Sequence, residues 1–442
     1  MTTELPNLDR SLGPTPGATQ FYRQLNAYCT ANGKKAYNFG QGAEIDQPGG
    51  AIAQILAEKT ATTTSPSYPV NGGSDALREA MAGWAKRMFA INATKTNTFV
   101  FGCQGRASLD TLFKMTAYEA RQKNITNPAI LIGTTHWPML DQHARMLGLN
   151  LQGYTMAQDN FPGVITQALE QDKDGNILAV YVNSPDNPTG IQRKAAEIKA
   201  LMDALEQINT TRNANNQPLV RIIFDTPYFM ACEQRGSDAV SLLDAGFDNV
   251  LDNDALLTPW FVDISFSKAY GFATPGLHTV ITHPKYAKNF GDVVNTVYGN
   301  GIEIAFAEKV IRILGAENDA EALAHFAMLK NKYTQNKATL AQSFEEYLVA
   351  GDPNMTCLMA LPQDFFGRKV QGKVVNKIYS INDMNDFLEY CGWEKNVVFV
   401  NNGGVLARIA MAMKPENFVA GVKLFREAFD EVYQSEKVSA AA

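Results

Sequence analysis

The sequence predicts an α/β fold in which a mainly parallel sheet is covered by helices on both faces. From about residue 97 to residue 284, short apolar runs rich in β-type residues alternate with segments of helical periodicity. Runs that are apolar at every position, and not only at every second one, are typical of strands buried on both faces. The chain has 442 residues, which is enough for two or more domains around a substantial core.

The elements of this fold follow in order along the chain. A short helical stretch near residues 21–29 comes first, and strands are predicted at 98–101, 129–132, 177–182, 220–224, 261–264 and 279–281. Helices are predicted near 106–120 and 138–147, and a third places Ile198, Leu201 and Leu205 on one face. A long helical region at about 303–349 stops before Gly351-Asp-Pro, and the last helix begins at Pro415.

These elements suggest a division into domains. Residues 51–320 are expected to form a large domain that carries the ligand, and residues 321–442 a small C-terminal α+β domain. Residues 1–50 are expected to supply an N-terminal arm and part of the small domain, and the long helix of about 303–349 is expected to run between the domains.

Composition and charge exclude several classes of partner. The formal net charge is −6 and no basic block occurs, so neither nucleic acid nor an anionic membrane is expected as a partner. The five cysteines are widely spaced and contain no CxxC, which argues against a disulfide framework and a zinc site. No signal peptide and no run of transmembrane length is found. A cytoplasmic, reducing location is therefore expected.

The segment Ser265-Phe-Ser-Lys268 says most about the chemistry. Lys268 closes the apolar run 260–264, where an ionisable amine is costly unless it is paired, exposed or chemically engaged. A desolvated lysine becomes a nucleophile that forms Schiff bases with carbonyl compounds, and Ser265 and Ser267 can donate to an anion beside it. A carbonyl compound with an anion describes pyridoxal phosphate (PLP). Taken alone, the lysine can equally extend its amine from the strand end into water.

Two other predicted strands end in polar groups at the same sheet edge. Residues 183–190 form a turn with two Asn/Asp-Pro steps, and the next strand ends in Asp225-Thr-Pro-Tyr228. Singly, these are a strand-to-helix loop and a loop-bracing carboxylate. Together, a carboxylate can keep a pyridine nitrogen protonated, an amide and a phenol can bind the phenolate O3′, and Lys268 can hold the aldehyde carbon. PLP requires this set of contacts from a protein.

On these residues the chain resembles the fold-type I PLP-dependent aminotransferases of class I/II, and the aspartate/aromatic branch in particular. Asn-Pro-Thr-Gly at 187–190, Asp-x-x-Tyr at 225–228 and Ser-x-Ser-Lys at 265–268 occur in the family's order. Segments 38–43, 67–78, 135–138 and 407–412 are also similar to family motifs, so that the resemblance covers essentially the whole chain. It implies a large domain with a seven-stranded sheet, a small α+β domain, and a homodimer with active sites at the subunit interface.

The resemblance also implies a role for each matching residue. Lys268 is the expected Schiff-base lysine and acid/base catalyst, Asp225 the partner of the pyridinium, and Tyr228 with Asn187 the ligands of O3′. The implied cofactor-binding residues are Gly102, Cys103, Gln104, Gly105, Arg106, Trp137, Asn187, Asp225, Tyr228, Ser265, Ser267, Lys268, His278 and, across the dimer, Tyr68. The implied substrate-binding residues are Arg408, which would pair with the α-carboxylate, and Gly42, Ala43, Asn187 and Trp137.

Three positions depart from the family pattern. His278 stands where an arginine usually binds the phosphate, and Arg106 either compensates for the loss or is simply exposed. Leu140 replaces a histidine behind the pyridinium-binding aspartate, so that hydrogen bond is lost or rearranged. Asn295 stands where dicarboxylate-specific members carry an arginine, which makes strict aspartate or glutamate specificity doubtful.

The resulting hypothesis is an aminotransferase that moves an amino group between an L-amino acid and a 2-oxo acid by a ping-pong mechanism. The same cofactor frame also supports lyases, decarboxylases and synthases, which differ in substrate-facing residues. A PLP-binding regulator or inactive scaffold is disfavoured, because Lys268 is present and residues 1–50 are too short for a DNA-binding domain.

Overall fold

The computed structural model describes residues 18–58, 70–102, 106–155, 160–236, 238–248, 250–251, 256–272, 276–297 and 302–437. The chain divides into two compact units. The large unit comprises Asp46–Asn187 and Ile191–Leu329, and the small unit comprises Met1–Ile45, Pro188–Gly190 and Lys330–Ala442. Each unit has its own sheets and its own core.

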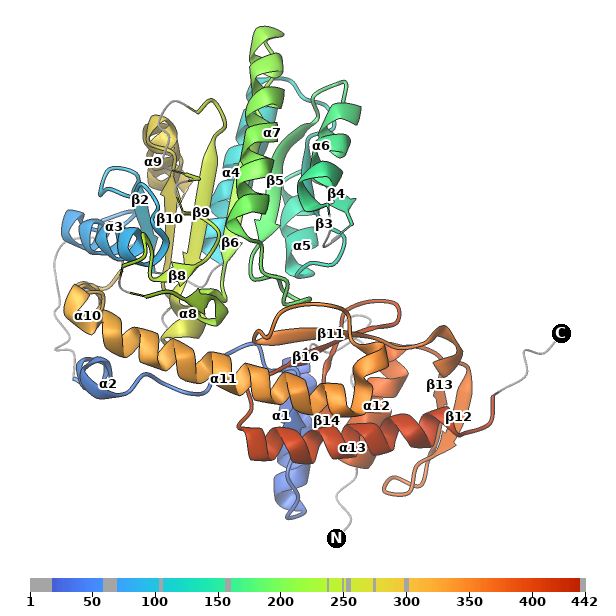
Figure 1. Cartoon of the computed structure of the whole chain (residues 1–442). Coiled ribbons are helices and arrows are strands. Elements are labelled where there is room, and N and C mark those ends of the chain that lie inside the picture. The colour runs from blue at the N-terminus through green and yellow to red at the C-terminus, as the bar shows by residue number, and fades with distance from the viewer. Residues whose placement is uncertain are drawn as a thin grey trace. The chain divides into compact units, whose positions relative to one another are not determined.

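A seven-stranded sheet forms the centre of the large unit (Figure 1). Its order is β2 (Thr98–Phe101), β10 (His278–Thr282), β9 (Trp260–Ser265), β6 (Arg221–Thr226), β5 (Ile177–Asn183), β3 (Ala129–Gly133) and β4 (Asn150–Tyr154). Strand β10 is antiparallel to both of its neighbours, and the other pairs are parallel. The α/β class and the mainly parallel sheet predicted from the sequence are therefore confirmed.

Strand β4 was not predicted. It lies at the edge of the sheet, and only Tyr154 of its five residues is fully buried. The six predicted strands are buried at every residue. An edge strand that is open to water needs no continuous apolar run, so the pattern that identified the other six is missing from it.

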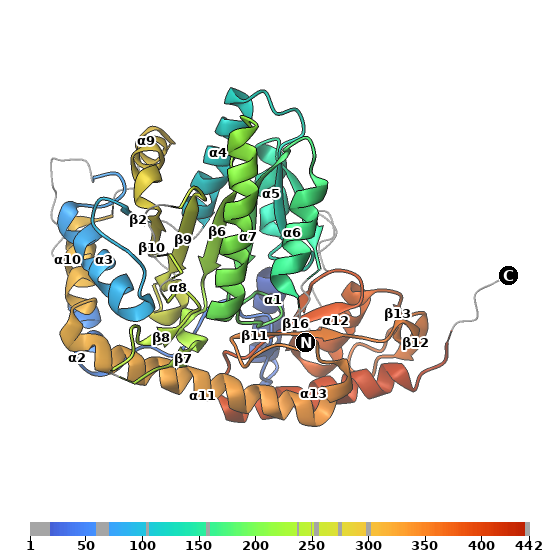
Figure 2. The ribbon, with the colours of Figure 1, turned by 45° about the horizontal axis from the view of Figure 1, so that its top comes forward.

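Helices cover both faces of this sheet (Figures 1 and 2). On one face α4 (Arg106–Gln122), α5 (Met139–Met146) and α9 (Ala287–Val297) share a core with the strands. On the other face α6 (Phe161–Gln171) packs beside α7 (Ala195–Ala214), whose predicted stripe is buried. The unit also contains α2 (Gly50–Ala57), α3 (Asp75–Phe89), α8 (Phe266–Ala269), and the two-residue strands β7 (Glu233–Gln234) and β8 (Leu243–Asp244).

The single long helix predicted at about 303–349 is wrong, because two helices occupy this region. Helix α10 (Ile304–Ile313) ends before Gly315, whose backbone is extended with ψ 145°, and α11 (Asp319–Phe344) begins after a 3-10 turn at Ala316–Asn318. The Asn318 side chain donates to the Arg312 carbonyl at 2.8 Å. This bond satisfies one of the carbonyls that α10 leaves without a helical partner.

The small unit is an α+β assembly. Strand β1 (Tyr37–Asn38) pairs with β14 (Val397–Val398), and β12 (Arg368–Gln371) pairs with β13 (Ile378–Ile381). In a three-stranded sheet, β16 (Leu406–Ala410) lies between β11 (Thr356–Ala360) and β15 (Val400–Asn401). Helices α1 (Ala18–Ala31), α12 (Met384–Lys395), α13 (Pro415–Tyr433) and the second half of α11 complete it. This unit also has 3-10 turns at Glu345–Tyr347 and Gln363–Phe365, and the large unit has them at Phe229–Ala231 and Pro284–Tyr286.

An aromatic core holds the small unit together. Phe425 of α13 contacts the rings of Phe39, Phe344, Phe387 and Phe399, with centroid distances of 5.1 to 6.1 Å. Phe418, Val422, Phe425 and Phe429 recur at helical spacing in α13, and all four are buried. Rings at such distances contribute beyond the area they bury.

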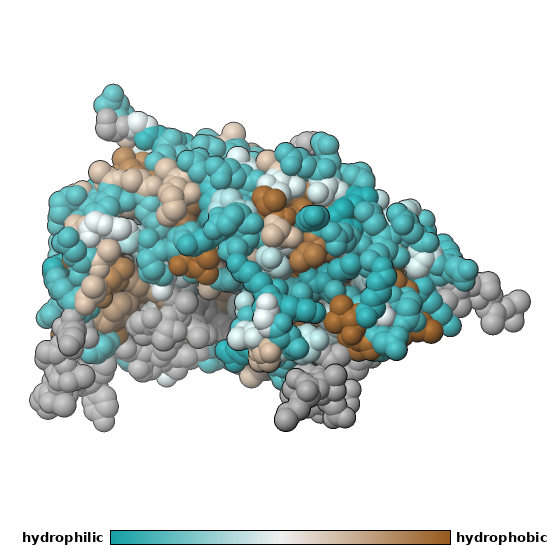
Figure 3. Space-filling view, turned by 90° about the horizontal axis from the view of Figure 1, so that it is seen from below, coloured by the Kyte–Doolittle hydropathy of each residue, from teal (hydrophilic) through white to brown (hydrophobic). Residues whose placement is uncertain are grey.

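The surface offers no extensive apolar face in the view of Figure 3, where hydrophobic residues form small groups separated by hydrophilic ones. Among the helices that the structure describes, none is both long and apolar enough to cross a membrane.

Candidate active site

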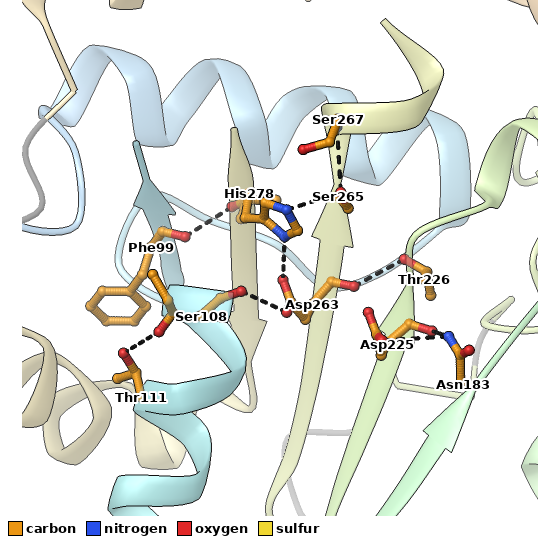
Figure 4. A network of polar contacts seen from close by, with 12 residues as sticks. Phe99, Ser108, Thr111, Asn183, Asp225, Thr226, Asp263, Ser265, Ser267 and His278 are labelled. Carbon is orange, nitrogen blue, oxygen red and sulfur yellow. Dashed lines mark hydrogen bonds and ion pairs between the residues drawn. The ribbon is translucent and has the colours of Figure 1, made fainter. Parts of the chain in front are cut away.

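The polar residues of the site continue an apolar face of the sheet. Tyr181 of β5, Ile223 of β6 and Phe261 of β9 are in register and belong to the core under α4. Two residues further along the same strands, Asn183, Asp225 and Asp263 are again in register. Since side chains two residues apart in a strand share a face, this row lies on the α4 side of the sheet. Figure 4 shows the row across the three strands.

Asp225 is the buried carboxyl at the centre of the row, with an exposed fraction of 8 %. The Tyr181 hydroxyl donates to its Oδ2 at 2.5 Å, and the Asn183 amide donates to its backbone carbonyl at 2.9 Å. Burial, followed by the neighbouring carboxyl of Asp263, raises the pKa of Asp225 to about 8, against the opposing effects of the Tyr181 hydrogen bond and the Lys268 charge. A cationic partner is therefore needed to stabilise the ionised form of this desolvated carboxyl.

Tyr181 supplies the hydrogen bond to Asp225 that the Leu140 side chain cannot make. Leu140 is fully buried in the apolar core and offers no hydrogen bond. The bond to Asp225 comes from the neighbouring strand instead, through the Tyr181 hydroxyl. Burial raises the pKa of Tyr181 well above its ordinary value, and the charge of Asp225 and then this hydrogen bond raise it further. The hydrogen bond is rearranged and not lost.

Asn183 links two strand ends. Its side-chain oxygen accepts the backbone N–H of Asn187 at 2.7 Å, while its amide is bonded to Asp225. It thereby fixes the start of the turn that carries Asn187. Tyr228 is buried two residues beyond the end of β6, at the start of the 3-10 turn Phe229–Ala231.

Lys268 lies on α8, a single turn of helix that begins directly after β9. It is three residues past the strand end, so the sequence interpretation that it closes the strand is corrected by this turn. The Ser265 side chain caps the turn and accepts the Ser267 N–H at 3.3 Å. Lys268 is partly exposed, and its charge lowers the pKa of Asp225. Gly271 follows with φ +69°, where a Cβ would collide with the Gln47 side chain.

His278 lies beside Ser265, its register partner on the neighbouring strand. Its Nε2 is 2.9 Å from the Ser265 hydroxyl and its Nδ1 is 3.3 Å from Oδ1 of Asp263. The other oxygen of Asp263 accepts the hydroxyl of Ser108 on α4 at 2.7 Å. Both ring nitrogens of His278 are thus engaged within the network of Figure 4.

The remaining sequence-predicted residues of the large unit are described only in part. Trp137 is partly buried against the core under α4. The preceding His136 contacts the Gly133 carbonyl at 2.7 Å, which holds this loop to β3. Gly102 directly follows β2. Tyr68, Cys103, Gln104, Gly105 and the side chain of Arg106 lie outside the described residues.

In the small unit, Arg408 of β16 is partly buried, and its Nη2 donates to the Gly40 carbonyl at 3.2 Å. Gly42, Ala43 and Glu44 follow in the same loop, which continues to Gly49. The Glu44 side chain is buried, where it accepts Lys332 Nζ at 2.5 Å and the Tyr333 hydroxyl at 2.6 Å. Helix α11 thus anchors this loop at Glu44, and Arg408 contacts it at Gly40.

Sequence reasoning missed Tyr181, Asp263 and Glu44. The signal for Asp263 was available, because a carboxylate inside the apolar run 260–264 is costly and lies on the same face as Ser265 two residues later. Tyr181 carries no comparable signal, since a tyrosine in an apolar strand is ordinary. Glu44 is one acidic residue in a loop, and only its partners on α11 distinguish it.

The chain belongs to the aminotransferase class I and II family, whose model matches residues 34–418. It is a PLP-dependent aminotransferase, acting on an amino acid and a 2-oxo acid. A search of the curated proteins gives no match.

Solved structures of similar fold include several aminotransferases. An aspartate aminotransferase from Rhizobium meliloti has a TM-score of 0.70 at 15% identity, covering 96% of this chain and 98% of that one. The aspartate aminotransferase from Thermus thermophilus with maleate has a TM-score of 0.69 at 15% identity, with 94% and 97% covered. An aminotransferase from Eubacterium rectale has a TM-score of 0.69 at 16% identity, with 98% and 100% covered. At these identities the likeness concerns the fold.

Proposed function

We propose that the active site of this aminotransferase is centred on Lys268 and Asp225, with Asn187, Tyr228, Ser265 and Ser267 around the cofactor. The observation that carries the proposal is the buried Asp225 carboxyl, whose pKa is raised by burial and lowered by the charge of Lys268. A pyridinium is the cation that such a carboxyl can hold in a PLP enzyme. The donor set fits the group: an amine for the aldehyde, a carboxylate for the ring, and hydroxyls for the phosphate.

When bound, PLP supplies an electron sink that weakens the bonds to the substrate's α-carbon. The chain's own residues do the rest. Asp225 keeps the ring nitrogen protonated, and Tyr181 and Asn183 hold Asp225 in place by the bonds described above. The Lys268 amine would hold the cofactor through its aldehyde carbon and, once freed by the substrate, would take the proton from the substrate α-carbon and deliver it to that former aldehyde carbon.

Substrate recognition is assigned to the small unit. Arg408 would form a two-pronged pair with the substrate α-carboxylate, in a geometry that lysine does not reproduce. The loop Gly40–Glu44 carries Gly42 and Ala43, and its anchor on Lys332 and Tyr333 supports a fixed substrate-binding backbone. Asn295, an exposed residue of α9, offers no charge for a second carboxylate. We therefore propose that the enzyme is not strictly dicarboxylate-specific.

The assembly and location belong to the same proposal. A homodimer is typical of this family, and the resemblance of residues 67–78 to the segment that reaches a partner's phosphate supports it here. The five widely spaced cysteines, without a CxxC pair, support a reducing, cytoplasmic location. Sedimentation of the holoenzyme, compared with that of Tyr68→Phe, measures the first of these.

A single half-reaction tests the transaminase assignment against a lyase. Holoenzyme is mixed with excess L-amino acid and no 2-oxo acid. A transaminase converts one equivalent of bound PLP into pyridoxamine phosphate, releases one equivalent of 2-oxo acid, and stops. Continuous release of pyruvate or ammonia, with the cofactor returned as PLP, would instead assign the enzyme to the lyases.

A further inference from the structure

Four buried side chains form a continuous chain on the sheet beside Lys268 (Figure 4). The Ser108 hydroxyl of α4 donates to Asp263 Oδ2 at 2.7 Å, Asp263 Oδ1 is 3.3 Å from His278 Nδ1, and His278 Nε2 is 2.9 Å from Ser265 Oγ. The Asp263 side chain is 0 % exposed and the His278 side chain 6 %. Such a chain is costly to bury unless its hydrogen bonds are complete.

The hydrogen positions along this chain follow from the donors available. Ser108 satisfies one oxygen of Asp263, and the His278 Nδ1–H satisfies the other. Nε2 of His278 then either accepts the Ser265 hydroxyl or, in the protonated ring, donates to it. Ser265 has a single hydroxyl hydrogen. Only when Nε2 donates is that hydrogen left to bond a group outside the chain.

The carboxyl that faces the His278 ring is that of Asp263 on the adjacent strand β9. Asp225 lies one strand further, on β6 in register with Asp263, and the charge of Lys268 on α8 lowers its pKa. On α4, Lys114 Nζ forms an ion pair with Asp110 Oδ2 at 2.8 Å. On β2, the residue in register with His278 is Phe101. A buried carboxylate next to an imidazole stabilises its charged form.

We propose that Asp263 and His278 orient Ser265 as a hydroxyl donor to the cofactor's phosphate, in place of the arginine that the family usually provides. This inference rests on the proposed function, which assigns the phosphate to Ser265 and Ser267. The cation stays one side chain away from the phosphate, and its effect reaches the anion through the Ser265 hydroxyl. Asp263 and Ser108 are positioning residues: Asp263 holds the His278 ring at Nδ1, and Ser108 holds Asp263.

Comparing PLP with pyridoxal, which lacks the phosphate, isolates this role. The dissociation constants of both compounds are measured on stripped and reloaded protein, for the wild type, His278→Gln and Asp263→Asn. Hydrogen bonds to charged groups are among the stronger ones. The preference for PLP over pyridoxal should therefore fall about tenfold or more in each variant. Asp225→Asn acts on the ring, which both compounds share, and should weaken both.

Two further variants distinguish the loss of the phosphate contact from a general folding defect. Ser265→Ala removes the donor and leaves the buried pair intact, so its preference for PLP should fall as well. His283→Gln replaces another buried histidine, which lies at the opposite end of β10 and should leave the preference unchanged. In the PLP-loaded wild type, ¹⁵N NMR of His278 should show a hydrogen on both ring nitrogens, which a purely structural histidine has no reason to gain.

The results separate the inference from the proposal on which it rests. An unchanged preference for PLP in His278→Gln, Asp263→Asn and Ser265→Ala, with PLP still bound to Lys268, would overturn the inference alone. A wild type that binds neither compound at Lys268 would overturn both. A neutral His278 ring in the PLP complex would also contradict the inference.

Discussion

Replacing Asp225 by asparagine should change how the stability of the cofactor-free protein depends on pH. In the folded chain the pKa of Asp225 is raised from its ordinary value of 3.8 to about 8 by burial and by the carboxyl of Asp263. One pKa unit corresponds to about 1.4 kcal/mol. Ionising this carboxyl in the folded protein therefore costs on the order of 5 kcal/mol more than in the unfolded chain.

The sign follows from the protons that each state binds. Between pH 4 and pH 8 the folded state keeps the Asp225 proton and the unfolded state has released it, so stability falls as pH rises through this range. Below pH 4 both states are protonated and the contribution is constant. Asparagine does not titrate. The difference in unfolding free energy, wild type minus Asp225→Asn, should therefore decrease by roughly 5 kcal/mol from pH 4 to pH 9.

Urea unfolding of both cofactor-free proteins at half-unit pH intervals measures this difference. Other titrating groups are shared by the two proteins and cancel in the subtraction. With PLP bound, the ring cation compensates the ionised carboxyl, so the wild type should regain its stability at high pH and Asp225→Asn should not. Parallel stability curves for the two cofactor-free proteins would refute the claim that Asp225 is desolvated and raised in pKa.

Three smaller perturbations test neighbouring parts of the account. Tyr181→Phe removes the hydrogen bond that lowers the pKa of Asp225, so the fall in cofactor-free stability should extend to higher pH, and an unchanged curve would contradict that bond. Arg408→Lys should raise KM for amino acids about tenfold or more with a smaller change in kcat, because the two-pronged pair is lost; steady-state kinetics decides, and an unaltered KM would exclude Arg408 as the carboxylate ligand. Glu44→Gln removes the carboxylate that pairs with the buried Lys332 ammonium and should cost about 3 kcal/mol in urea unfolding. Tyr333→Phe, which keeps that ion pair, should cost about 1 kcal/mol, and equal losses would contradict the ion pair as the anchor.

Much of the fold was predictable because burial on both faces leaves a plain signal. Strands β5, β6 and β9 are buried at every residue and mostly apolar. Each ends at, or within a few residues of, a polar group that the sequence interpretation selected. The edge strand β4 has no such signal, because water satisfies its exposed side. The break between α10 and α11 was missed, because helical periodicity on both sides of Gly315 hid an extended residue.

The site was predictable where a residue type is needed for chemistry and not where a partner decides its role. Lys268 and Asp225 stand out because their charges are expensive at a buried sheet edge. Asp263 is equally expensive, but its function depends on His278, which reaches it only because β10 is antiparallel and brings residue 278 beside Ser265. Tyr181 depends in the same way on the register between β5 and β6. Such pairs follow from topology, and local sequence does not reveal them.

Mapping the lysine that holds the cofactor tests the central claim most directly. The PLP-loaded protein is reduced with borohydride, digested, and the peptides are sequenced by mass spectrometry. The account predicts one equivalent of reduced pyridoxal phosphate on Lys268, and none in Lys268→Ala. A label on another lysine, with Lys268 unmodified, would contradict it.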